Sequence, residues 1–116
     1  MMIETQTAAE VEIHDRQTGH GFAVGPESEV IAKIRIFLEN GEEIFPELRE
    51  QEHLLKLSSK HTVAGLRQGL EGMCAGGIRE IVIQPKLAYG EKGVPGVIPE
   101  DATLRYEVRL LKVIGH

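Results

Sequence analysis

The sequence predicts an α+β fold in which an antiparallel sheet of five or six strands wraps around one short α-helix. Three observations predict it. Apolar and polar residues alternate over several stretches, which is the period of half-buried strands. The stretch 62–73 spaces its apolar side chains by three and four instead, as a helix does. Glycine-rich turns and an Asn-Gly pair join the alternating stretches, so hairpins dominate the order of elements.

The composition is that of one globular domain. The chain has 116 residues, of which 41% are hydrophobic and 27% are charged, and this length can bury a sizeable core. We expect residues 1–7 to be a flexible tail and residues 8–116 to be a single domain. The net charge of −5 and the lack of a basic stripe argue against nucleic acid or an anionic membrane as the main partner. No apolar run is long enough to span a bilayer.

The first elements follow from alternation and from turn residues. Residues 10–14 alternate and predict an edge strand, and residues 15–21 read as a turn. Residues 22–24 predict a short strand that Gly25-Pro26 ends.

A longer strand is predicted over residues 30–38, with Lys33 and Arg35 on its outer face. Its inward face carries alternate apolar residues, namely Val30, Ala32, Ile34, Ile36 and Leu38. Asn40-Gly41 then predicts a hairpin, because these residues accept positive φ at low cost. The return strand covers residues 43–45, and Pro46 should end it or place it at a sheet edge.

One helix is predicted in the middle of the chain. Residues 47–53 are polar and fit either a loop or a short helical turn, and residues 54–57 form the next apolar piece. Thr62 is a candidate helix cap, and Gly76-Gly77 is expected to end the helix. Its inward stripe would be Val63, Leu66, Leu70 and Met73, with Arg67, Gln68 and Glu71 facing water.

The most informative segment lies between the alternating runs 78–83 and 104–113. Its prolines fix φ and its glycines permit positive φ, so the loop is shaped rather than floppy; they are Pro85, Pro95 and Pro99, with Gly90, Gly93 and Gly96. It carries one aromatic residue, Tyr89, and a short apolar tip. Long loops held between strands usually serve binding.

Several motifs in this part of the chain resemble the FKBP family of peptidyl-prolyl isomerases. They are Leu87-Ala88-Tyr89-Gly90, then Gly93-Val94-Pro95-Gly96-Val97-Ile98-Pro99, then Ala102-Thr103-Leu104 before the closing strand. The run from Gly65 to Met73 resembles the helix of that family. The likeness is specific from about residue 60 to 114, thinner over 29–45 and absent before that. It implies the same α+β fold and a rotamase activity on Xaa-Pro bonds.

The resemblance implies roles for residues of this chain. The backbone N–H of Val63 would hold one substrate carbonyl, and the hydroxyl of Tyr89, which follows Ala88, would hold another. Val97 and Ile98 match the loop residues that cover the proline. The catalytic residues implied are therefore Tyr89, Val63 and Ile98.

Other positions depart from the pattern of the family. Leu66 stands in place of the tryptophan at the pocket floor, Ile34 in place of a tyrosine, and Tyr106 in place of a phenylalanine. The Phe-Asp pair of the family falls on Ile44-Phe45 or on Phe45-Pro46, and in both alignments the aspartate is missing. The substrate-binding set that follows is Ile34, Ile44, Phe45, Leu66, Ala88, Val97 and Tyr106.

Each of these assignments has a structural alternative. Leu66 and Ile34 either line a reshaped proline pocket or fill it, and leucine in place of tryptophan favours a pocket because it opens volume. Tyr89 is either a substrate donor or a phenol that ties its loop to the sheet. Tyr106 is either part of the pocket or ordinary core.

Prolyl isomerisation fits a site of this composition. The barrier of ~18–20 kcal/mol arises from amide resonance, and lowering it requires no nucleophile, metal or cofactor. A dry apolar pocket disfavours the charge-separated planar amide and makes rotation easier. The five histidines are scattered without the spacing of metal ligands. Cys74 is the only cysteine, so no internal disulfide is possible, and we expect a buried or half-buried thiol.

Two functions are compatible with this sequence. The first is a cytoplasmic, monomeric prolyl isomerase of weak or narrow activity, which binds proline-containing peptides or proteins, needs no cofactor, and binds macrolides weakly because aromatic walls are missing. The alternative is a non-catalytic binding module that holds a partner peptide through residues 89–98. The cytoplasmic location is expected because the amino terminus lacks the pattern of a secretion signal.

Overall fold

The computed structural model describes residues 7, 8 and 10–115. The strands in this part of the chain are β1 (Thr7–Ala8), β2 (Val11–Gln17), β3 (Glu29–Leu38), β4 (Glu43–Ile44), β5 (His53–Lys56), β6 (Ile78–Ile83) and β7 (Leu104–Gly115). The α-helix in the same part is α1 (Ala64–Leu70), and the 3-10 turns are η1 (Pro46–Leu48) and η2 (Pro85–Leu87). Within the described residues, no helix has the length and apolar character that a membrane crossing needs.

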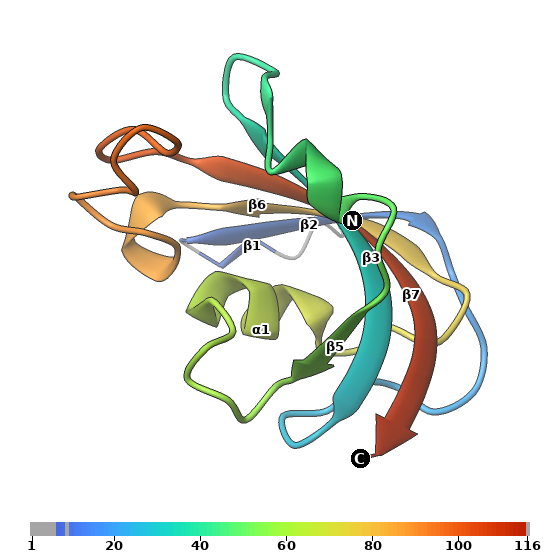
Figure 1. The fold of residues 1–116 in the computed structure, drawn as a ribbon. Coiled ribbons are helices and arrows are strands. Elements are labelled where there is room, and N and C mark those ends of the chain that lie inside the picture. Colours follow the sequence, from blue (N-terminus) through green and yellow to red (C-terminus); the bar gives the residue numbers. More distant parts are fainter. Residues whose placement is uncertain (1–6, 9, 116) are drawn as a thin grey trace, which may run out of the picture.

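The strands form one antiparallel sheet in the order β1-β2-β6-β7-β3-β4, and β5 pairs with the other end of β3. The sheet curves around α1, which lies on its concave side (Figure 1). Five of the described strands have four residues or more, while β1 and β4 have two each. The predicted fold class is therefore confirmed. Of the predicted tail, Thr7 pairs with Glu12 in the sheet, and residues 1–6 lie outside the described residues.

The core lies between α1 and the inner face of the sheet. The inward residues of β3 are those that alternation predicted, and each is at most 9% exposed: Val30, Ala32, Ile34, Ile36 and Leu38. The inward residues of β7 are equally buried: Leu104, Tyr106, Val108 and Leu110. Burying one leucine or isoleucine contributes about 1.5–3 kcal/mol, so these two long strands supply much of the stability of the fold.

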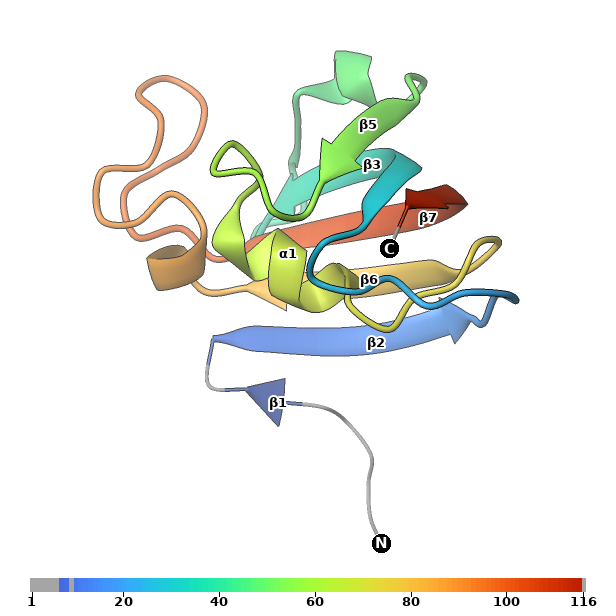
Figure 2. The same ribbon diagram turned by 90° about the horizontal axis from the view of Figure 1, so that it is seen from below.

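Two glycines allow α1 to lie directly on β6. A Cβ at Gly65 would collide with the side chain of Ile83, and a Cβ at Gly69 would collide with that of Ile81. The first turn of α1 also lies beside η2 (Figure 2), where the carbonyl oxygen of Leu87 is 3.1 Å from the Cβ that Gly65 lacks. Glycine at these positions therefore gives up helix propensity, about 1 kcal/mol each, in exchange for close packing.

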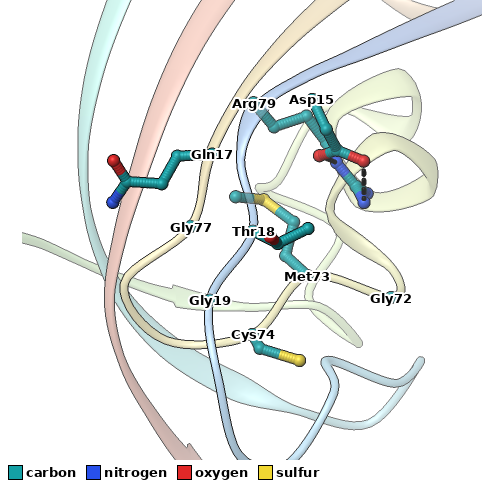
Figure 3. Close-up of a pocket in the computed structure, with 9 residues that line it drawn as sticks. All are labelled: Asp15, Gln17, Thr18, Gly19, Gly72, Met73, Cys74, Gly77 and Arg79. Atoms are coloured by element: carbon teal, nitrogen blue, oxygen red, sulfur yellow. Dashed lines mark hydrogen bonds and ion pairs between the residues drawn. The ribbon is translucent and has the colours of Figure 1, made fainter.

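A buried arginine ends the helix. The guanidinium of Arg79 donates to the carbonyl oxygens of Gly69 (2.8 Å) and Glu71 (2.9 Å) and pairs with Asp15 through two bonds of 2.6 and 3.2 Å. Figure 3 shows the two charged groups facing each other beside a small cavity of about 140 Å³. The last carbonyls of a helix lack partners inside it, so this side chain acts as the missing donor. Cys74, on the wall of the same cavity, is half-buried as predicted.

The helix is shorter than the sequence predicted. It ends at Leu70, well before Gly76, because Gly72 has φ +89° and turns the chain away. Thr62 does not cap it: the Thr62 hydroxyl donates to the carbonyl of Lys56, and Val63 is the residue at the N-cap position. Arg67, expected to face water, is half-buried.

Two predictions for the amino-terminal part are also wrong. The predicted turn over 15–21 starts late, because β2 continues to Gln17 through a bulge between Asp15 and Gln17. The predicted strand over 22–24 is missing, because Val24 exchanges backbone hydrogen bonds with Gly72 and Met73 after the helix rather than with a strand. The predicted hairpin at Asn40-Gly41 is confirmed, although its return strand stops at Ile44.

Candidate active site

The segment from residue 84 to 103, between β6 and β7, is held in one shape by its own backbone. The N–H of Gly90 donates to Pro85 (2.7 Å) and that of Gly93 to Tyr89 (3.1 Å). At the tip, Val94 and Ile98 exchange two backbone bonds of 2.8 and 2.9 Å. Gly93 has φ +61°, and a Cβ there would collide with backbone carbonyls of the next turn. The loop is thus preorganised at the end of the sheet nearest the start of α1.

Five predicted site residues are buried members of the hydrophobic core, and we call these five the floor. They come from β3, β4, α1, the loop and β7, and their exposed fractions are 2–7%: Ile34, Ile44, Leu66, Ile98 and Tyr106. Cross-strand pairing explains part of this cluster, since Ile36 lies opposite both Ile44 and Tyr106. The inward face of β3 thus contributes Ile34 to the floor and pairs with the strands that carry Ile44 and Tyr106.

The other five predicted site residues form what we call the rim, namely Phe45, Val63, Ala88, Tyr89 and Val97. Phe45, Val63 and Ala88 are half-buried and pack against the hydrophobic core. Tyr89 and Val97 are the exposed members, at 38% and 37%. Ile98 is thus the buried member of the predicted covering pair, and Val97 lies outside the core. The surface open to a ligand therefore comes mainly from the rim.

The two phenols of the chain meet at this site. Burial raises the pKa of Tyr106 well above its usual range, and the interaction with the nearby Tyr89 raises it further. Tyr106 is 2% exposed and Tyr89 is 38% exposed. The pair therefore links the buried floor to the exposed rim.

A second candidate donor is a backbone N–H that is free within the described residues. Val63 precedes the first residue of α1, and its carbonyl accepts from Arg67. Its own N–H has no hydrogen-bond partner among the described residues. An unpaired, half-buried N–H is costly unless a ligand or water satisfies it, so this group is available to a carbonyl of a bound peptide.

Phe45 occupies a strained conformation beside the floor. Its φ of 52° and ψ of 49° are left-handed, a region that a bulky residue adopts at a cost of about 1–3 kcal/mol. The turn that follows supports it, because Leu48 donates its N–H to the carbonyl of Phe45 at 2.9 Å. Phe45 also packs against the hydrophobic core.

Some contributors were missed by sequence reasoning. Leu87, Val94 and Ala102 of the loop also pack half-buried against the hydrophobic core. These residues could have been identified from the sequence, because they are apolar within a polar, proline-rich loop. Among the described residues, there is no group of three or more histidine, cysteine, aspartate or glutamate side chains that could hold a metal ion.

Fold and site together define a class: small α+β domains that present an apolar floor, a free backbone N–H and a tyrosine hydroxyl beside a rigid loop. A model of the FKBP-type peptidyl-prolyl cis-trans isomerase family matches residues 21–111. The chain belongs to this family, and the resemblance noted from its motifs is confirmed.

Particular relatives are similar over different shares of their length. The FK506-binding protein of Neisseria meningitidis serogroup A is 37% identical over 102 residues, which cover 87% of this chain and 94% of the relative. The human peptidyl-prolyl cis-trans isomerase FKBP2 is 44% identical over 77 residues, or 66% of this chain and 54% of that protein. FK506-binding protein 2 of Candida glabrata is 42% identical over 65% of this chain and 56% of its own length. The chain thus spans about half the length of these last two relatives.

Solved structures agree with the fold. The N-terminal domain of FKBP42 from Arabidopsis thaliana has a TM-score of 0.84 and 25% identity, covering 98% of this chain and 94% of that domain. FkpA from Escherichia coli has a TM-score of 0.83 and 30% identity, covering 96% of this chain and 52% of that one.

Proposed function

We propose that this chain is a peptidyl-prolyl cis-trans isomerase that acts on Xaa-Pro bonds in peptides or proteins, with weak or narrow activity, and so assists protein folding. One observation carries the proposal: the chain offers two hydrogen-bond donors beside its apolar core, namely the unpaired N–H of half-buried Val63 and the hydroxyl of Tyr89 next to the buried Tyr106. Membership of the isomerase family supports it.

The reaction needs only these parts. Rotation about the Xaa-Pro bond must cross a barrier of ~18–20 kcal/mol that amide resonance sets. The planar amide is more charge-separated than the twisted one, so an apolar surface that excludes water favours the twist. The Val63 N–H and the Tyr89 hydroxyl would hold the carbonyls that flank the proline while its ring contacts the floor.

Three features support weak or narrow activity. Leu66 and Ile34 present less aromatic surface than the tryptophan and tyrosine that the resemblance implies at their positions. The floor side chains are at most 7% exposed, so a proline ring can contact little of the floor without a shift of the rim. None of the ten described floor and rim residues is a carboxylic acid.

The decisive experiment is a protease-free isomerisation assay by NMR exchange on a short Leu-Pro peptide. We expect the wild-type protein to accelerate exchange and Tyr89→Phe to lower kcat/KM about tenfold, since a hydrogen bond to substrate contributes about 1.4 kcal/mol. Leu66→Lys should abolish the acceleration. Leu54→Lys is the matched control, because Leu54 lies on β5 and is already 56% exposed.

Either of two results would refute the proposed isomerase activity. One is the lack of any acceleration by folded protein at high concentration. The other is equal loss in Leu66→Lys and Leu54→Lys. A lysine at buried position 66 can unfold the chain. Tyr89→Phe changes an exposed residue, so its effect on the exchange rate tests the proposed activity independently of folding.

The alternative function is a binding module without useful catalysis. The closed floor and the exposed rim residues Tyr89 and Val97 favour it, because a partner can be held by the rim alone. It predicts that proline-containing peptides shift the NMR signals of residues 89–98 while the exchange rate of their Xaa-Pro bond stays unchanged.

We also propose the macrolide affinity, oligomeric state and cellular location of the chain. Macrolides of the FK506 type should bind weakly, because the floor offers a single aromatic ring, that of Tyr106. We propose a monomer that works in the cytoplasm, where one free, half-buried cysteine needs no partner. Sedimentation of the purified chain and fractionation of cells test these two points.

A further inference from the structure

A basic cavity of about 430 Å³ lies on the outer face of the sheet, away from the candidate active site. Five cations line it: Arg16, Lys33, Arg35, Arg49 and Arg109. Two carboxylates, Glu50 and Glu107, share the lining. The formal charge of the lining is therefore +3 in a chain whose net charge is −5. Cations thus outnumber carboxylates in the lining of this cavity.

The centre of this cavity carries a like-charge pair. Lys33 of β3 lies directly opposite Arg109 of β7, and Ile78 of β6 lies on the other side of Arg109. Like charges directly opposite on neighbouring strands destabilise a sheet. Neither Lys33 nor Arg109 makes an ion pair or side-chain hydrogen bond within the described residues. These two cations are therefore available to a ligand.

The surrounding cations are held in place by acids. Arg35 pairs with Glu43 at 3.0 Å and with Glu107 at 3.8 Å, and Arg49 reaches the same Glu43 at 3.2 Å. Arg16 pairs with Glu80 at 3.1 Å and sits in the bulge of β2, a distortion that commonly redirects a side chain. The outer members are thus positioned, while the central pair is left unneutralised.

We propose that this cavity binds a small molecule that carries two or more phosphate groups. A volume of about 430 Å³ lies in the range of small-molecule pockets, about 300–1,000 Å³. The planar fork of arginine matches phosphate oxygens bidentately, and the central pair requires an anion to offset its repulsion. The site also gives a role to the segment after η1, which contributes Arg49.

The test uses inorganic tripolyphosphate and the full chain at about 10 mM ionic strength, where screening extends over about 30 Å. We expect saturable binding by calorimetry, with NMR shifts at Lys33, Arg109 and Arg16 and none at Val63 or Tyr89. Lys33→Gln and Arg109→Gln should each weaken binding about tenfold, because each removes one charge-assisted contact. Lys60 is exposed and lies outside the cavity, so Lys60→Gln makes the same change of charge but should leave binding unchanged.

Thermal unfolding provides a second test that does not require binding to be measured directly. Without ligand, Lys33→Gln should raise Tm, because the like-charge pair is gone, while Lys60→Gln should leave it unchanged. Tripolyphosphate should raise the Tm of the wild type more than that of Lys33→Gln.

The proposal fails if tripolyphosphate does not saturate, or if Lys60→Gln weakens binding as much as the cavity variants do. It also fails if a hexaglutamate peptide binds through Lys33 and Arg109 while tripolyphosphate does not, since the face would then serve an acidic protein segment.

Discussion

At the scale of single residues, two side chains bury polar groups that a core rarely accepts. Tyr106 places its phenol beneath the candidate active site, 2% exposed, beside Tyr89. Arg79 places a guanidinium under the end of α1, with its residue 8% exposed. Both are tolerated because each has a partner: a second phenol in one case, and a carboxylate and two carbonyls in the other.

The buried phenol predicts sensitivity to alkali. An unfolded tyrosine ionises near pH 10, whereas burial raises the pKa of Tyr106 above that value. The stabilising effect is thus complete below about pH 10 and is lost as pH rises toward the folded pKa, at up to about 1.4 kcal/mol per pH unit. Tyr106→Phe should remove this extra slope in urea unfolding at pH 9–11.5. Equal slopes in both proteins would show that Tyr106 ionises freely in the fold.

The buried arginine predicts a large loss of stability when its charge is removed. Arg79→Met should lower the free energy of unfolding by about 3 kcal/mol, because the carbonyls of Gly69 and Glu71 lose their donor. Arg49→Met is the control, since its ion pair with Glu43 is exposed and should contribute no more than about 1 kcal/mol. A loss of similar size in both variants, measured by urea unfolding, would contradict this role.

At the scale of elements, α1 shows a conflict between local preference and packing. A seven-residue helix that contains Gly65 and Gly69 is a poor helix by itself. It forms because its backbone lies against Ile81 and Ile83 of β6 and because Arg79 satisfies its last carbonyls. The helix is therefore a product of the tertiary structure.

This packing predicts the sign of a substitution. In a free helix, Gly69→Ala would stabilise by about 1 kcal/mol, but here the new Cβ meets Ile81, so we expect a loss of about 1–3 kcal/mol. In the background Ile81→Ala, which removes the obstructing atoms, the same change should become neutral or favourable. A double-mutant cycle by chemical unfolding measures the difference, and additivity of the two changes would exclude direct contact.

Elements with strong local signals were predictable, and those set by distant partners were not. Alternation over 30–38 and the Asn40-Gly41 turn gave β3 and its hairpin correctly. The end of α1 was predicted too late, because it depends on Arg79, whose partner Asp15 is 64 residues away in sequence. The site residues came from a family resemblance over residues 60–114 and, more thinly, 29–45. The proximity of Tyr89 to Tyr106 and the free N–H of Val63 needed the three-dimensional fold.

At the scale of the whole molecule, the sheet has two faces of opposite character. The inner face is apolar and carries α1 and the floor of the candidate active site. The outer face carries ion pairs and a phenylalanine, Phe37, that is covered by the guanidinium groups of Arg105 and Arg35 at 4.2 and 5.0 Å. The two proposed binding sites therefore lie on opposite sides of one layer of strands.

A single shared core predicts cooperative unfolding. One buried cluster joins residues from β2 to β7, so far-UV circular dichroism and tyrosine fluorescence should give the same midpoint in urea. The comparison is informative because the chain has no tryptophan and its two tyrosines both lie at the candidate site. An earlier fluorescence transition would show that the site loosens before the sheet, and would contradict one cooperative unit.

The donor at residue 63 belongs to the main chain, and this has a consequence for how such a site changes over generations. The side chain of Val63 is not the group that would hold a substrate carbonyl, so many residue types there can keep the same chemistry. The positions that the site cannot vary are instead Gly65 and Gly69, which hold α1 against the sheet. In a saturation library selected for function, intolerance should therefore concentrate at two glycines that never meet the substrate.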